Sequence, residues 1–325
     1  MRVVVVGAGV LGLTCAVRLA EAGHEAHVLA RDLPLETTSA VAAALWYPYR
    51  AEPPDRVLAW SAFTYAALER LADEQPSSGV RMLEGTELLR SPADPPWWAS
   101  AVPRIEAVPD AELPEGYAAG RRLLAPVVDM SVHLPWLVAQ LEAAGGTVSR
   151  AWLPALPDEP VVVNCTGLSA RRLTQDATLY PVRGQVVLVE APGVDRWLLD
   201  GKAEAELTYV VPRERVVVVG GTADEGSSDR EPDRATASAI LARAGVLVPE
   251  LVGARVLGHR VGLRPARPTV RLESEHRLAG GMVVHCYGHG GAGVTLAQGC
   301  AEEVVGLVER GLSDVRPAGV SAGAG

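Results

Sequence analysis

The chain has 325 residues, a formal net charge of −9 and a hydrophobic fraction of 48%. This length allows two domains or one large one, and the apolar fraction supports a sizeable core. The acidic balance argues against binding to nucleic acid or to an anionic membrane surface. Apolar helical runs such as Cys15–Ala22 are too short to cross a bilayer, so we expect no membrane segment.

The N-terminal 32 residues have the pattern of a dinucleotide-binding unit. Val3–Val6 is an unbroken β-branched run, which is typical of a strand buried on both faces. Gly7, Gly9 and Gly12 follow at the G-x-G-x-x-G spacing. An Ala- and Leu-rich helix pattern comes next, and His24–Leu29 has the pattern of a second strand. The alternative is a tight strand-to-helix turn in another kind of α/β protein.

Each glycine of this motif has a physical role. Gly7 allows the tight turn, Gly9 lets the backbone approach a pyrophosphate, and Gly12 lets the helix pack on the strand. The phosphates would lie at a helix N-terminus, where free N–H groups and the helix dipole favour anions. Asp32 stands 20 residues after Gly12, where an acidic residue holds an adenosine ribose, but the adjacent Arg31 could receive a 2′-phosphate. The motif alone therefore leaves NAD, NADP and FAD open.

The middle of the chain alternates polar segments with short periodic ones. Residues 33–39 form a polar loop, and Val57–Leu71 has the apolar spacing of an amphipathic helix. Pro92–Pro114 is rich in Pro, Asp and Ala, which predicts a loop with short elements on a second domain. Ser131–Gly145 is predicted as a helix ended by two glycines, and Val161–Val163 as a short buried strand.

From Tyr180 onward the pattern changes to short strands joined by turns. The predicted strands are Gln185–Glu190, Leu207–Val211 and Arg215–Gly220, an arrangement that favours an antiparallel sheet. A predicted helix follows at Asp233–Ala244.

The nucleotide-binding pattern returns near the C-terminus, with a strand predicted at Met282–His285 and a helix at Thr295–Gly306. Residues 313–325 are rich in Gly, Ala and Ser, and we expect them to fray. We therefore predict an α/β fold with a discontinuous Rossmann-like cofactor domain and an inserted, mainly antiparallel α+β substrate domain. The predicted boundaries are 1–50, 127–180 and 258–315 for the cofactor domain, 51–126 and 181–257 for the substrate domain, and 316–325 for a disordered tail.

A second glycine-rich stretch lies between the last predicted strand and helix. Gly288, Gly290, Gly291 and Gly293 would let the backbone lie flat against a ligand and direct N–H groups at it. The N-terminus of a helix beginning near Thr295 could stabilise negative charge on a reduced flavin ring. A glycine-rich loop at a domain junction is the alternative. Two such junctions favour a long cofactor such as FAD over a mononucleotide.

Neither the histidines nor the cysteines predict a metal site. His285 and His289 are four residues apart, but glycine interrupts them and no carboxylate or cysteine cluster completes a ligand set. The cysteines stand far apart and include no C-x-x-C pair, so we expect buried free thiols in a reducing compartment rather than a disulfide framework. They are Cys15, Cys165, Cys286 and Cys300.

Two later residues are candidates for substrate binding. Arg264, within Gly-Leu-Arg-Pro-Ala-Arg-Pro (262–268), offers a planar fork to a carboxylate, although a surface arginine beside prolines would look the same. Tyr209 lies on a predicted strand and could bring a phenol to a ligand, with core packing as the alternative. The chain shows no Ser/His/Asp order and no nucleophile elbow, so no catalytic general base is indicated.

These motifs together resemble the D-amino-acid oxidases, the FAD-dependent family that includes D-aspartate oxidase. The resemblance runs in order along the chain to about residue 310. The glycine-rich block that contains His-Cys-Tyr-Gly-His-Gly-Gly-Ala-Gly, together with Leu-Arg-Pro, is its most specific part. The matching blocks are 5–14, 30–34, 37–49, 163–167, 181–185, 209–212, 262–268 and 285–296.

The resemblance implies oxidation of a D-amino acid at Cα, with hydride transfer to flavin N5 of a non-covalently bound FAD. Oxygen then reoxidises the flavin and hydrogen peroxide is released, while the imino acid hydrolyses to a 2-oxo acid and ammonia. This chemistry depends on positioning more than on acid–base groups, which agrees with the lack of a general base.

The resemblance also implies roles for particular residues. Arg264 would pair with the substrate carboxylate, Tyr209 would donate a hydrogen bond to it, the main chain of Gly291 would lie near the amine, and Tyr47 would stand beside the substrate. The implied FAD-binding residues are Gly7, Ala8, Gly9, Val10, Leu11, Gly12, Arg31, Asp32, Thr37, Thr38, Ser39, Ala43, Ala44, Leu45, Gly290, Gly291, Ala292, Gly293, Val294 and Thr295.

The chain departs from the family pattern in ways that affect specificity. Ala205 replaces a second tyrosine, Tyr47 stands where glutamine is common, and the lid of animal members is shorter here. Lys202, Arg213 and Arg215 match none of the arginines by which D-aspartate oxidases hold a side-chain carboxylate, so we expect a preference for neutral D-amino acids. The rival hypotheses are a glycine- or sarcosine-type amine oxidase and a flavin-free NAD(P)-binding reductase or regulator.

Further expectations concern partners and location. We expect a D-amino acid and molecular oxygen as partners, and a homodimer is compatible with the sequence. No signal peptide precedes the first strand, and the end Ser-Ala-Gly-Ala-Gly lacks a Ser-Lys-Leu peroxisomal address. With the Ala-, Arg-, Val- and Gly-rich composition, this predicts a bacterial, cytoplasmic enzyme.

Overall fold

The computed structural model describes residues 1–190, 193–200, 207–278 and 280–315. Its strands are β1 (Arg2–Val6), β2 (Glu25–Ala30), β3 (Val80–Leu89), β4 (Glu106–Ala107), β5 (Ala119–Val128), β6 (Thr147–Arg150), β7 (Val161–Asn164), β8 (Tyr180–Glu190), β9 (Trp197–Asp200), β10 (Thr208–Pro212), β11 (Val217–Gly220), β12 (Asp224–Glu225), β13 (Arg255–His276) and β14 (Met282–His289). Its α-helices are α1 (Val10–Glu21), α2 (Thr38–Val41), α3 (Pro54–Glu74), α4 (Met130–Ala143), α5 (Ala170–Leu173), α6 (Arg234–Leu247) and α7 (Gly293–Val315).

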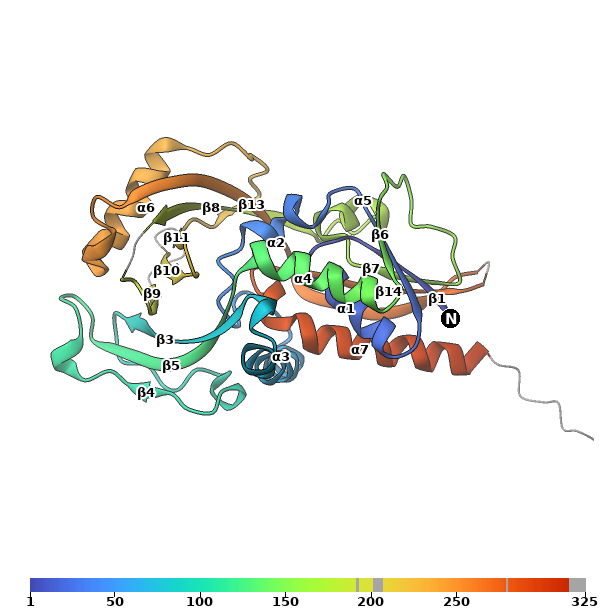
Figure 1. The fold of residues 1–325 in the computed structure, drawn as a ribbon, viewed down its shortest axis with the longest axis horizontal. Coiled ribbons are helices and arrows are strands. Elements are labelled where there is room, and N and C mark those ends of the chain that lie inside the picture. The colour runs from blue at the N-terminus through green and yellow to red at the C-terminus, as the bar shows by residue number, and fades with distance from the viewer. Residues whose placement is uncertain (191–192, 201–206, 279, 316–325) are drawn as a thin grey trace, which may run out of the picture.

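The strands form one mixed sheet that runs the length of the molecule (Figure 1). The strand order is β4-β5-β3-β9-β10-β11-β8-β13-β14-β7-β1-β2-β6, with β12 paired to β8 beside this path. The N-terminal strand β1 lies between β2, the next strand of the chain, and β7, which in turn pairs with the last strand, β14. The cofactor unit is therefore built from segments far apart in sequence.

The parallel end of the sheet comprises β14, β7, β1, β2 and β6. Val3–Val6 are between 0% and 4% exposed, which explains why this strand is apolar without alternation. Helix α1 contacts both α4 and α7 over this end of the sheet. The predicted Rossmann-like α/β unit is confirmed, as are the strands and helix that open it.

The rest of the sheet is mainly antiparallel, as predicted. Each strand is antiparallel to its neighbour in the order β8, β11, β10, β9. Strands β3 and β5 are also antiparallel, whereas β3 and β9 are parallel. Its aromatic core includes Trp46, Tyr65, Trp98 and Trp197. Helix α6 packs on β8, β10 and β11, and Figure 1 shows it at the outer end of the molecule.

Strand β13 joins the two regions. Its first half pairs with β8 as far as Ala266, which lies opposite Tyr180. Ala266 also lies opposite His289 of β14, and the pairing with β14 continues from Arg271 to His276. One strand thus hydrogen-bonds to both regions. Arg264 lies on this strand close to Ala266, where the pairing changes from β8 to β14 (the changeover).

Several elements differ from the sequence-based expectations. Strands β3 and β5 and the full length of β13, which carries Arg264, were not predicted. Strand β14 continues to His289, four residues beyond the predicted end. Helix α7 begins at Gly293 and reaches Val315, so residues 313–315 of the expected frayed end are helical. Lys202, Ala205 and residues 316–325 lie outside the described residues.

No helix within the described residues has both the length and the apolar character required to span a membrane.

Helices α3 and α7 approach each other closely at a glycine. The amide of Gly299 donates to Thr64 Oγ1 at 3.0 Å. A Cβ at position 299 would lie 2.5 Å from both Cα and the carbonyl oxygen of Trp60. Because these contacts are with backbone atoms, the helices would have to separate to admit a methyl group.

We expect Gly299→Ala to lower the free energy of unfolding by about 1–3 kcal/mol, the usual cost of overpacking. Gly306→Ala in the same helix is the matched control, because its Cβ would meet only the flexible end of Arg310. That control should be neutral or stabilising by up to about 1 kcal/mol, since alanine favours helix over glycine. Urea unfolding of both variants measures the difference. Equal stabilities would show that the α3–α7 contact is not a tight constraint.

Candidate active site

A cavity of about 630 Å³ is lined by both regions of the sheet. From the parallel region it takes the turns after β1, β2 and β7, and from the antiparallel region the faces of β3, β9, β10 and β13. All the residues that the sequence predicted for cofactor or substrate line this cavity except Gly12 and Ala292. Both exceptions are buried beside it, and the amide of Ala292 donates to the carbonyl of His289.

The turn after β1 is built so that only glycine fits. Gly7 has φ 113°, and a Cβ there would lie 2.4 Å from the carbonyl oxygen of Cys165. A Cβ on Gly12 would lie 1.9 Å from the carbonyl oxygen of Gly7, so α1 packs directly on the turn. Gly9 is the N-cap of α1, and the Val10 amide donates to Ser39 Oγ at 3.0 Å. The turn thus presents a helix N-terminus to the cavity, which suits a pyrophosphate.

An ion pair stands where β2 ends. Arg31 Nε donates to Asp32 Oδ1 at 2.9 Å, and Nη2 lies 2.5 Å from Oδ2. The hydrogen bond from Arg31 holds the pKa of Asp32 below its usual value, so the carboxylate is an acceptor at neutral pH. Both residues line the cavity, where this acceptor can meet ribose hydroxyl groups.

The second glycine turn lies at the start of α7. Gly290 has φ 56°, and a Cβ there would lie 2.6 Å from the carbonyl oxygen of Arg50. A Cβ on Gly291 would lie 2.6 Å from the ring of Tyr49. Thr295 Oγ1 donates to the Tyr47 carbonyl and accepts from the Tyr47 amide, each at 3.1 Å. The start of α7 is therefore fastened to the segment that follows α2, and both line the same cavity.

Arg264 projects from β13 into a space that a glycine keeps free. A Cβ on Gly184 would lie 2.4 Å from both Nη atoms of Arg264. Arg264 Nη1 donates to the carbonyl of Thr222 at 2.9 Å. No carboxylate of the described residues pairs with this guanidinium, so charged donors remain for a ligand.

Tyr209 stands next to Arg264 on the cavity wall. Its ring lies over the backbone of β11, since a Cβ on Gly220 would be 2.1 Å from Cζ. Burial raises the pKa of Tyr209, and the neighbouring Arg264 charge partly opposes that rise. The phenol is therefore neutral and able to donate a hydrogen bond beside a guanidinium, an arrangement suited to a carboxylate.

A buried acid on the cavity wall, Glu87, was not identified from the sequence. Tyr47 Oη donates to Glu87 Oε1 at 2.7 Å, and Arg121 Nη1 donates to Glu87 Oε2 at 3.0 Å. Glu87 is 4% exposed and lines the cavity. Burial, with the nearby Glu87 charge, raises the pKa of Tyr47 far above its usual value, so this phenol also stays neutral. The acid could have been found only by pairing β3 with β5, because Glu87 lies opposite Arg121.

The histidines and cysteines lie closer together than the sequence suggested. His289 Nε2 is 3.5 Å from Cys300 Sγ and 4.0 Å from Cys286 Sγ, and the sulfur atoms of Cys15, Cys165 and Cys286 lie within 4.8 Å of one another. The expectation that no cysteine cluster accompanies the histidines was wrong. All four cysteines are free, and burial raises the pKa of the Cys300 thiol, which favours the neutral form that packs as a small apolar side chain.

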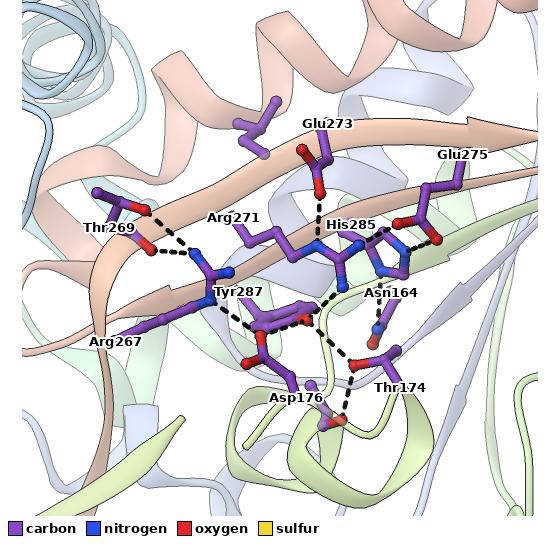
Figure 2. Close-up of polar contacts among 12 residues, drawn as sticks. Asn164, Thr174, Asp176, Arg267, Thr269, Arg271, Glu273, Glu275, His285 and Tyr287 are labelled. Carbon is purple, nitrogen blue, oxygen red and sulfur yellow. Dashed lines mark hydrogen bonds and ion pairs between the residues drawn. The ribbon is translucent and has the colours of Figure 1, made fainter. Parts of the chain in front are cut away.

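A network of charged and polar side chains lies beside the turn after β7 (Figure 2). His285 lies between Glu275 and Asn164, at 3.1 Å and 3.2 Å. Asn164 Oδ1 in turn accepts from the amide and the hydroxyl of Thr166, which lines the cavity. Asp176 accepts from Arg267 and Tyr287 at 2.9 Å each. His285 is thus engaged in a structural network that holds the turn after β7.

The fold and the glycine turns of the cavity define a dinucleotide-binding protein, and the comparisons with known proteins identify its family. The family model described as FAD dependent oxidoreductase matches residues 2–307. The chain is 50% identical over 317 residues to a D-amino-acid oxidase of Rubrobacter xylanophilus, with 96% of this chain and 97% of that protein covered. It is 48% identical over 312 residues to a D-amino-acid oxidase of Streptomyces coelicolor, covering 94% and 96%. The chain therefore belongs to the FAD-dependent oxidoreductase family, and its cofactor is FAD.

A more distant sequence relative and a solved structure are also similar to this chain. A human D-aspartate oxidase is 35% identical over 324 residues, with 94% of each chain covered. The structure of a glycine oxidase from Geobacillus kaustophilus superposes with a TM-score of 0.81 at 21% identity, covering 95% of each chain. The family resemblance inferred from the motifs is confirmed. The flavin-free NAD(P)-binding alternative is excluded by the family match.

The residues present fit the FAD cofactor, because two glycine turns with helix N-termini line one cavity.

A side chain at Gly9 would intrude on this cavity. A Cβ on Gly9 would already lie 3.1 Å from Ser39 Oγ, so the larger Gly9→Val change should displace the pyrophosphate or the turn. We expect this variant to purify largely without FAD while keeping its circular dichroism spectrum.

The ratio of flavin to protein absorbance measures the loss. Gly258→Val is the control, since a Cβ there would meet only the end of Arg260 at 3.4 Å. A Gly9→Val protein that carries a full complement of FAD would refute the assignment of the turn.

Proposed function

We propose that the protein catalyses the oxidative deamination of D-amino acids, with neutral ones preferred, to 2-oxo acids, ammonia and hydrogen peroxide. The observation that carries the proposal is the adjacent Arg264 and Tyr209 on the wall of the cavity that also holds the glycine turns. The two relatives at 48–50% identity are D-amino-acid oxidases, which supports the same substrate class. The glycine oxidase neighbour supports the fold alone.

In this proposal the chain's residues bind and orient the substrate. Arg264, held by the Thr222 carbonyl, pairs with the substrate carboxylate, and Tyr209 donates a second hydrogen bond to it. The main chain of Gly291 lies near the amine. FAD bound in this cavity would supply the acceptor for the hydride that leaves Cα. Because no residue is required as a general base, the protein contributes mainly orientation and exclusion of water.

The cofactor contacts are proposed by region. Gly7–Leu11, Gly12 and Thr37–Ser39 support the pyrophosphate, and Asp32 with Arg31 meets the adenosine ribose. Residues Ala43–Leu45 and Gly290–Thr295 contact the flavin ring, which is held without a covalent link. The domain division predicted from the sequence, with FAD bound by 1–50, 127–180 and 258–315, is part of the same proposal.

We also propose a bacterial, cytoplasmic enzyme that uses molecular oxygen as acceptor. The two most similar of the relatives named above are bacterial, and the four free cysteines suit a reducing compartment. A homodimer remains a prediction that sedimentation analysis would test.

The direct test of function is the purified protein itself. It should be yellow, acid precipitation should leave the flavin in the supernatant, and D-amino acids should release peroxide whereas L-amino acids should not. D-alanine, D-valine and D-methionine should each have a higher kcat/KM than D-aspartate. Turnover confined to glycine or sarcosine would instead support the amine oxidase hypothesis, and a higher kcat/KM for D-aspartate would refute the neutral preference.

We expect Arg264→Ala to lower kcat/KM, because it leaves a buried substrate carboxylate unpaired. The loss of transition-state stabilisation should be about 2–5 kcal/mol. Arg264→Lys should lose less, since the charge stays but the planar fork is lost. Tyr209→Phe removes one neutral donor and should cost about 0.5–1.5 kcal/mol. Steady-state kinetics on a good D-amino acid measures all three.

The FAD content of these variants separates binding of substrate from binding of cofactor. The flavin spectrum should survive every change, because the proposed roles concern the substrate. If Arg264→Ala keeps nearly normal kcat/KM, or if its loss only follows lost FAD, the role of Arg264 is refuted.

A further inference from the structure

We propose that Glu87 is a specificity-determining residue that excludes acidic side chains from the substrate cavity by neutralising Arg121. The inference rests on the proposed function, because it concerns which D-amino acids that site accepts. Its basis is a row of side chains across four strands of the sheet, together with the charges buried in that row.

The row is fixed by strand register. Tyr209 of β10 lies opposite Leu199 of β9, Leu199 lies opposite Glu87 of β3, and Glu87 lies opposite Arg121 of β5. Residues directly opposite one another on paired strands project from the same face of the sheet. Tyr209, Leu199 and Glu87 all line the cavity. Two strand spacings separate Tyr209 from Glu87, or about 10 Å along the sheet.

Arg264 and Glu87 stand on opposite sides of Tyr209. Arg264 belongs to β13, and the strand order places β11, β8 and β13 on one side of β10 and β9, β3 and β5 on the other. A substrate anchored by its carboxylate at Arg264 and Tyr209 therefore has its side chain directed over Leu199 toward Glu87. Leu199 gives the middle of this path an apolar surface, and Glu87 with Tyr47 forms its polar end.

The negative charge of Glu87, at the polar end of this path, is balanced by Arg121 within the protein. The side chains of Glu87 and Arg121 are 5% and 13% exposed, and their ion pair is 3.0 Å long. The other Glu87 oxygen accepts from Tyr47, and Arg121 Nη2 donates to the carbonyl of Asp94. Glu87 faces the cavity, whereas Arg121 does not line it. A second substrate carboxylate would therefore meet the like charge of Glu87, while the Arg121 charge behind it is already paired.

Removing the Glu87 charge should weaken or abolish this preference. Glu87→Gln keeps the size of the side chain and an acceptor oxygen, but leaves the Arg121 charge unbalanced in a poorly solvated site. Such a charge favours an anion brought close to it, because electrostatic complementarity is strongest where water is excluded. The variant should therefore accept D-glutamate, whose side chain carries a carboxylate toward Arg121.

The test compares D-glutamate with its neutral isostere D-glutamine. The unmodified enzyme should favour D-glutamine by about tenfold or more in kcat/KM, and Glu87→Gln should shift the ratio toward D-glutamate by about tenfold or more. Glu87→Gln combined with Arg121→Met should lose that gain, because the gain depends on the Arg121 charge. Glu84→Gln is the matched control on the same strand, where Glu84 forms an exposed ion pair with Arg196, and it should change nothing.

A binding measurement separates this inference from the proposed function. Glutarate and its monocarboxylate analogue pentanoate can be titrated against the flavin spectrum of the holoenzyme, without turnover. Glu87→Gln should tighten glutarate relative to pentanoate by about tenfold, and the double variant should not. If the protein turned over none of the D-amino acids, the proposed function would be refuted. The titration would still test the role of Glu87, because it needs no turnover.

Three outcomes would overturn the role of Glu87. The first is an unmodified enzyme that uses D-glutamate as well as D-glutamine, a result that needs no variant to fold. The second is an FAD-loaded Glu87→Gln protein with unchanged ratios for both substrates and ligands. The third is a gain that persists when Arg121 is also replaced.

Discussion

The active site depends on the pairing of a single long strand. Strand β13 hydrogen-bonds to β8 over its first half and to β14 over its second, with Ala266 paired on both sides. Arg264 is two residues from that changeover, and β14 leads directly into the glycine turn at the start of α7. The distance between Arg264 and the glycine turn at the start of α7 is thereby set largely by the pairing of the backbone.

The local parts of the site could be predicted from the sequence because their physical causes are local. A buried strand, three spaced glycines and a helix start are sufficient to predict the turn at Gly7–Gly12, and the structure shows why side chains are excluded there. The fold class and the discontinuous cofactor unit followed from the same pattern returning at both ends of the chain. The roles of the individual residues in that turn remain proposals.

Other parts of the site depend on pairing between distant segments and could not be predicted. Strand β3 carries Glu84 and Glu87, and an acidic residue argues against a buried strand until its partner is known. Arg121 supplies that partner from β5. Arg264 lies beside Pro265, and proline is uncommon within a sheet, but Pro265 is paired with Pro181 on β8, where neither residue needs to donate a backbone hydrogen bond. The four cysteines converge for the same reason, since they come from four separate segments of the fold.

The shared strand also bears on how a substrate reaches the cavity. A rotation of the antiparallel region against the parallel region would have to bend β13 near Ala266, where its pairing passes from β8 to β14. Such a bend would move Arg264 relative to the glycine turn after β14, and both line the cavity. Widening of the cavity and alignment of the groups that line it are therefore coupled through one strand.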